Sequence, residues 1–122
     1  MNKEILELIN RRENQLLLHC ALYYEFGKNI ISDDLYDKWS FELKDLIDEY
    51  PKEFSLSNNK DNFNKFDPSS GYYLNYTNYI DRAANVYNYY CKVNKINDGI
   101  KMESVSDHID RLKKRWYYES YF

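Results

Sequence analysis

The spacing of apolar residues at the start of the chain predicts a long helix. Between residues 3 and 26 apolar side chains recur at the spacing of one helix face; they are Ile5, Leu8, Ile9, Leu16, Cys20 and Tyr23. Gly27 follows this stretch and is a natural terminator. We therefore expect a first helix over residues 3–26.

A second amphipathic helix is predicted after a short connector, residues 28–31. Ser32 suits the N-cap position, and Asp33 and Asp34 place negative charge where it complements the helix dipole. The most regular apolar stripe of the chain follows, formed by Leu35, Trp39, Leu43, Leu46, Ile47 and Tyr50. Pro51 is expected to stop the helix. Two helices joined so closely should pack as an antiparallel hairpin.

The periodicity is lost after Pro51 and returns later. Residues 52–75 are rich in Ser, Asn and Asp and predict a loop, pinned to the body by Phe54, Phe63 and Phe66. A third helix is expected from about Tyr76 to Asn97, ended by Asp98-Gly99, with the inward residues Ile80, Ala83, Ala84, Tyr87, Tyr90 and Cys91.

A fourth helix is expected from Ser104, which forms a capping-box-like pair with Asp107; its apolar stripe is Val105, Ile109, Leu112 and Trp116. The aromatic tail, residues 116–122, is expected to fold back on the bundle or to form a partner surface. The chain of 122 residues thus predicts one all-α domain. It is a small helical bundle with a hairpin (1–51), a long ordered loop (52–75) and two further helices (76–122).

Composition and charge narrow the classes of partner. An apolar fraction of 43% argues against disorder. A net charge of −3 does not suit a direct nucleic-acid ligand. The charged N-terminal residues lack the apolar core of a signal peptide, and no apolar run is long enough for a membrane span. We expect a cytoplasmic protein without a metal site, in which Cys20 and Cys91 are free buried thiols.

Aromatic and acidic residues stand at fixed spacings between His19 and Pro51. Together with the polar and apolar residues between them, they form a pattern carried by Tyr23, Tyr24, Ile31, Ser32, Asp33, Tyr36, Asp37, Glu42, Leu43, Leu46 and Pro51. In this register the hairpin resembles the N-terminal subdomain of NAD-dependent DNA ligases, which grips the nicotinamide mononucleotide (NMN) half of NAD. Residues 52–122 do not follow the ligase sequence, and their features resemble small phage and prophage proteins related to this ligase.

The resemblance implies five ligand contacts: Tyr23, Tyr24, Asp33, Tyr36 and Asp37. The chemistry agrees, because aromatic rings beside carboxylates suit a flat cationic ring and a ribose diol. A structural alternative stays open, in which the aspartates only complement the helix dipole and Tyr36 only packs against the first helix.

Ligase activity is not expected. Ligases use a lysine in a Lys-x-Asp-Gly motif, and the nearest string here, Lys95 to Gly99, is one residue too long and falls at a predicted helix end. The sequence therefore predicts a protein that is not an enzyme and requires no cofactor.

Three functions remain as hypotheses. The first is a phage or mobile-element protein that binds and modulates a host protein, such as a defence nuclease, as an anti-CRISPR does, or a replication factor; a homodimer is a related alternative. The second is a binding protein for NMN, NAD or a similar nicotinamide nucleotide. The third and weakest is an enzyme that cleaves NAD or NMN.

Overall fold

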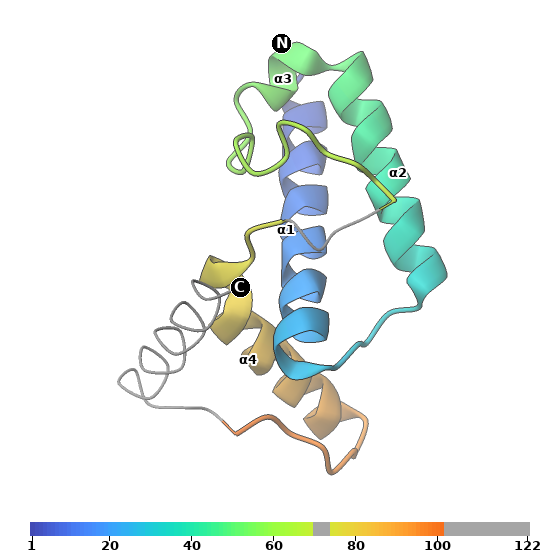
Figure 1. The fold of residues 1–122 in the computed structure, drawn as a ribbon, viewed down its shortest axis with the longest axis vertical. Helices are drawn as coiled ribbons and strands as arrows, with labels where there is room; N and C mark the ends of the chain where they lie inside the picture. The colour runs from blue at the N-terminus through green and yellow to red at the C-terminus, as the bar shows by residue number, and fades with distance from the viewer. Residues whose placement is uncertain (70–73, 102–122) are drawn as a thin grey trace, which may run out of the picture.

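The helix α1 (Lys3–Phe26) is the central element of the fold and packs against each of the other helices in the described part of the chain. The computed structural model describes residues 1–69 and 74–101, and over these residues the chain forms helices and no strand. In Figure 1, α2 (Asp33–Glu49) runs antiparallel to α1, and α4 (Ile80–Val93) crosses α1 on its other side. The predicted all-α bundle and its N-terminal hairpin are confirmed.

Local capping explains why the two hairpin helices begin and end where the sequence predicts. Gly27 adopts a left-handed conformation (φ 65°), and its N–H donates to the carbonyl of Tyr23. The N–H of Lys28 reaches back to the carbonyl of Leu22 at 3.0 Å, which completes a Schellman-type end. At the start of α2, Ser32 Oγ accepts the N–H of Leu35 at 3.1 Å.

Pro51 ends α2 as predicted but also begins a further helix. The short helix α3 spans Pro51–Phe54, so the predicted loop of residues 52–75 is wrong in its first three residues. Proline is favoured at the first position of a helix, because the N–H that it lacks would have no partner inside the helix. The carboxylate of Glu53 accepts the N–H of Asn2 at 3.1 Å, which ties α3 to the start of α1.

The loop after α3 is pinned by aromatic side chains, as predicted. Phe63 is fully buried, Phe66 is 6% exposed, and their rings meet edge to face at 5.1 Å. Phe54 is half-buried against the same core. This core joins the loop to α1, α2 and α4 through residues that include Ile9, Leu16, Leu17, Leu22, Leu43, Ile80 and Ala83.

The buried carboxyl of Glu13 holds the loop to α1. It accepts a hydrogen bond from Ser57 Oγ at 2.8 Å and one from the backbone N–H of Asn59 at 3.3 Å. Burial is the largest influence on this group and raises the pKa of Glu13 to about 7, against the two hydrogen bonds, which lower it.

The predicted helix of residues 76–97 is shorter than expected at both ends. It begins with the 3-10 turn η1 (Thr77–Tyr79), and α4 ends at Val93. Lys95 takes the left-handed conformation (φ 55°), and the N–H of Ile96 donates to the carbonyl of Cys91 at 2.8 Å. A lysine therefore occupies the terminating position that the sequence assigned to Gly99.

Most of the residues predicted to face inward on the third helix are buried. Of the predicted inward residues of α4, Tyr90 is only half-buried, whereas the other five are buried. Cys20 and Cys91 are both buried, and neither forms a disulfide. The predicted helix from Ser104 and the tail of residues 116–122 lie outside the described residues.

Among the helices of residues 1–69 and 74–101, none has the length and apolar character to cross a membrane.

Candidate functional site

A pocket opens where the hairpin turns, between the end of α1 and the start of α2. Its volume is about 160 Å³, and the described residues that line it are His19, Cys20, Tyr23, Tyr24, Asn29, Ile31, Ser32, Asp33 and Tyr36. An engineered protein cavity of about 150 Å³ holds one benzene molecule. The pocket is therefore large enough for a single six-membered ring and too small for a complete dinucleotide.

Four of the five predicted contacts line this pocket, and Asp37 does not. Tyr23 and Tyr24 come from the last turn of α1, and Asp33 and Tyr36 come from the first turn of α2. Asp37 is exposed and lies outside the lining. Adjacent helix residues point about 100° apart, so Tyr36 and Asp37 face different directions.

The two adjacent tyrosines form an exposed aromatic rim. Tyr23 is 57% exposed, although it shares the helical spacing of the apolar residues of α1, and Tyr24 is 47% exposed. Their rings meet edge to face at 5.0 Å, and Tyr24 stacks on Tyr76 with centroids 6.3 Å apart and planes 12° apart. The contact with Tyr76 fixes one ring of the rim from outside the hairpin.

The inner part of the pocket is polar but uncharged. Tyr36 Oη lies 2.9 Å from Cys20 Sγ, and either atom can donate. Burial raises the pKa of both groups above their ordinary values, so the thiol and the phenol stay protonated at neutral pH. A protonated thiol is a poor nucleophile, so this pair does not supply an activated sulfur.

His19 adds an imidazole to the pocket wall, although it is not among the ligand contacts predicted from the sequence. Its ring packs on Trp39 with centroids 5.7 Å apart. Burial lowers the pKa of His19, so the imidazole is neutral at pH 7.

A sequence signal for these missed residues did exist. His19 precedes Tyr23 by four positions, and Cys20 precedes Tyr24 by four, so each pair shares a helix face. The other missed lining residues, Asn29, Ile31 and Ser32, belong to the connector and the N-cap. Their contribution depends on the path of the connector, which helical periodicity does not describe.

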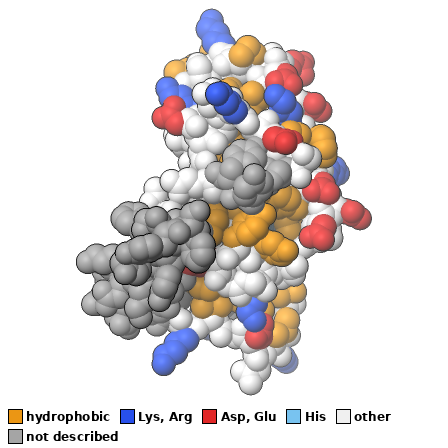
Figure 2. Space-filling model, in the orientation of Figure 1, with side chains coloured by type: hydrophobic (Ala, Val, Ile, Leu, Met, Phe, Trp, Pro, Cys, Tyr) orange, Lys and Arg blue, Asp and Glu red, His pale blue; other side chains and the backbone are white. Residues whose placement is uncertain are grey.

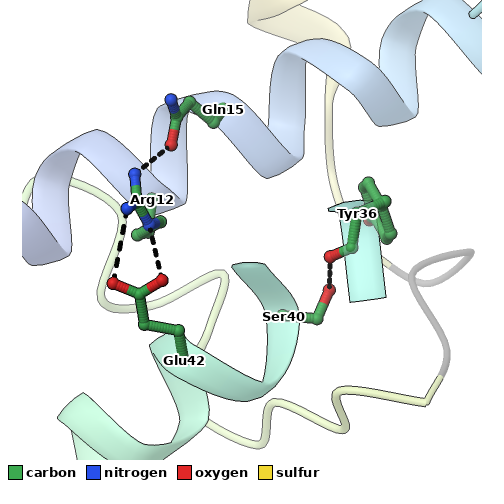
Figure 3. A network of polar contacts seen from close by, with 5 residues as sticks. All are labelled: Arg12, Gln15, Tyr36, Ser40 and Glu42. Atoms are coloured by element: carbon green, nitrogen blue, oxygen red, sulfur yellow. Dashed lines mark hydrogen bonds and ion pairs between the residues drawn. The ribbon is translucent and has the colours of Figure 1, made fainter. Parts of the chain in front are cut away.

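An ion pair joins the two helices of the hairpin. Arg12 of α1 pairs with Glu42 of α2, with Nε 3.3 Å from Oε2 and Nη2 3.3 Å from Oε1, while its Nη1 donates to Gln15 Oε1 at 2.7 Å (Figure 3). Figure 3 also shows Ser40 Oγ donating to the carbonyl of Tyr36 at 3.0 Å. The contact of Ser40 lies within α2, and of these contacts only the pair of Arg12 with Glu42 ties α2 to α1.

The arrangement offers recognition groups for one flat ring. Tyrosine rings supply stacking surfaces, Asp33 supplies a carboxylate, and Ser32 and Asn29 supply polar groups at the mouth. Within residues 1–69 and 74–101, no three His, Cys, Asp or Glu side chains are grouped so as to hold a metal ion.

Comparison with known proteins assigns no family to the chain. No family model matches it, and no significant match was found among curated proteins or solved structures. The resemblance of the hairpin to the ligase subdomain thus stays a prediction that rests on the sequence pattern.

Proposed function

We propose that the protein is a non-catalytic binding protein for a nicotinamide nucleotide of the NMN or NAD class, with the hairpin pocket as its site. The observation that carries the proposal is that four residues singled out from the sequence, Tyr23, Tyr24, Asp33 and Tyr36, line one pocket of single-ring size. The proposal favours ligand binding over interaction with a host protein.

The groups around the pocket match the parts of such a ligand. The nicotinamide ring of the oxidised nucleotide is flat and positively charged, and aromatic faces attract such a cation. Asp33 can accept hydrogen bonds from the ribose hydroxyls at the pocket mouth. The volume admits the ring alone, so the sugar would lie at the rim and the adenylate half of NAD would lie outside.

Calorimetric titration with NMN tests this proposal. We expect saturable binding, weakened about fivefold or more by Tyr23→Ala and by Asp33→Asn, because loss of one cation–π or charge contact is worth about 1 kcal/mol. Matched controls are Tyr89→Ala, an exposed tyrosine of α4, and Asp34→Asn, the exposed neighbour of Asp33. Both controls should bind NMN like the parent chain.

Two outcomes would count against the proposal. One is the absence of saturable heat at millimolar NMN. The other is equal weakening by Asp33→Asn and Asp34→Asn, because a pocket contact differs from its neighbour whereas a general change in helix charge does not.

A second candidate function is binding to another protein, and an exposed apolar stripe on α4 favours it. Val86, Tyr89 and Val93 are 37%, 69% and 59% exposed, and their spacing of three and four places them on one face. On this proposal a phage or mobile-element protein in the host cytoplasm uses the stripe to bind a host protein or a second copy of itself.

Substitution within the stripe tests the second candidate. We expect Val93→Lys to abolish capture of a host protein or to dissociate a dimer in sedimentation, while Asp33→Asn leaves both unchanged. A charged substitution within an apolar contact costs about 2 kcal/mol or more of binding free energy. Unchanged capture and an unchanged sedimentation coefficient in Val93→Lys would exclude the stripe as an interface.

A further inference from the structure

The described lining of the pocket carries one ionised group, and it is negative. Asp33 is a carboxylate, whereas no described lining residue is a lysine or an arginine. His19, Cys20 and Tyr36 are neutral at pH 7, since burial disfavours their charged forms. The pocket therefore offers a favourable field to a cation and no counter-charge to an anion.

The cations nearest to the pocket in sequence are Lys28 and Lys38, and neither belongs to its described lining. Lys28 precedes the lining residue Asn29, but its Nζ binds Asp98 at 2.8 Å and lies 5.8 Å from the ring centroid of Tyr87. Lys38 follows the lining residue Tyr36 by two positions in α2, and helix residues two apart do not share a face. Recruiting Lys28 to a phosphate would break its ion pair with Asp98.

The start of α2 is also unfavourable for a phosphate. A helix N-terminus ordinarily attracts anions, but here Ser32 Oγ already accepts the N–H of Leu35, and Asp33 and Asp34 occupy the first turn. The helix carries seven carboxylates against two lysines, and Figure 2 shows acidic side chains along the edge that α2 forms. A phosphate that approached the pocket mouth would meet negative charge.

From this charge distribution we infer that the pocket recognises an oxidised, positively charged nicotinamide riboside unit and does not grip the phosphate that follows it. The inference rests on the proposed function and narrows it to a ligand class. Tyr23 and Tyr24 line the pocket with aromatic rings that can attract the cation, and Asp33 adds a Coulombic attraction. Reduction of the ring to the neutral dihydronicotinamide removes both contributions, so the pocket separates the two redox forms by charge.

Calorimetry with three ligands tests the inference: oxidised nicotinamide riboside, its reduced dihydro form, and NMN. We expect the riboside to bind as tightly as NMN, or tighter, with any advantage of NMN below about threefold. We expect the reduced riboside to bind about tenfold more weakly or worse, the combined effect of a lost cation–π contact and a lost ion pair.

Two variants test which charged side chains contribute to the binding of these ligands. Asp33→Asn should weaken the oxidised riboside by a larger factor than the reduced riboside, because both ligands lose the contact with the ribose hydroxyls and only the oxidised ring also loses the attraction between charges. Lys28→Gln should leave the ratio of NMN to riboside affinity unchanged, since its ammonium group is held by Asp98.

The outcomes separate failure of the inference from failure of the proposed function. NMN binding more than threefold tighter than the riboside, a selective loss of NMN affinity in Lys28→Gln, or a reduced riboside that binds as well as the oxidised one would overturn the inference. In each of those cases binding to the pocket still stands. Absence of binding by all three ligands would overturn both.

Discussion

Replacing Phe63 by alanine is expected to lower the free energy of unfolding by about 3–5 kcal/mol. Its ring is fully buried and packs on Phe66 within the core that joins the loop to α1. Truncation removes apolar contacts and leaves a cavity that the surrounding helices fill only partly. Urea denaturation followed by circular dichroism measures the loss.

The matched control is Phe41→Ala on α2. Phe41 is 53% exposed, so its truncation should cost well under about 1 kcal/mol. Equal small losses in the two variants would show that the loop contributes little to the core and would refute the role assigned to Phe63.

The stability of the parent chain is expected to fall as pH rises from about 5 to 8, through Glu13. Its folded-state pKa of about 7 lies above the ordinary value of 4.5, so between these values the folded chain binds more protons than the unfolded chain. The contribution is fully present below the unfolded pKa and is lost as pH rises through the folded one. The difference corresponds to about 3 kcal/mol.

Glu13→Gln isolates this contribution. Glutamine stays neutral at every pH and can still bond with Ser57 and Asn59, so the variant should lack the loss above pH 5 and should be at least as stable as the parent chain at pH 8. Denaturation midpoints at several pH values measure it, with Glu7→Gln, an exposed glutamate of the same helix, as control.

The pH dependence of the stability of Glu13→Gln must be compared with that of the parent chain, because His19 changes stability with pH in the opposite direction. Its lowered folded-state pKa makes the folded chain bind fewer protons, so this contribution to stability is lost as pH falls. Parallel pH curves for Glu13→Gln and the parent chain would contradict the assignment of the loss to Glu13.

Local signals predicted the hairpin well because its boundaries are set by neighbouring atoms. Gly27 and Ser32 act through hydrogen bonds to residues within five positions of themselves. The sequence predicted the end of α4 too far along the chain, because it assigned the terminating position to Gly99. Gly99 is the better left-handed residue in isolation, yet Lys95 adopts that conformation where the helix closes on Cys91.

The pocket was partly predictable for the same reason. Tyr23, Tyr24, Asp33 and Tyr36 flank one short turn, so helix periodicity brings them together. Contacts between distant segments were not predictable from spacing, such as the stacking of Tyr24 on Tyr76. The hydrogen bonds of Glu13 were also not predictable from spacing, because its partners Ser57 and Asn59 lie in a stretch without periodicity.

The position of the pocket along the chain has a consequence for folding. All of its described lining residues fall between His19 and Tyr36, so only a short loop must close to assemble it. The carboxyl of Glu13, by contrast, meets partners more than forty positions away. Contacts of short sequence separation form fastest. We therefore expect the pocket to assemble with the hairpin, before the loop docks, so that loop substitutions affect the lifetime of the folded chain more than the shape of its site.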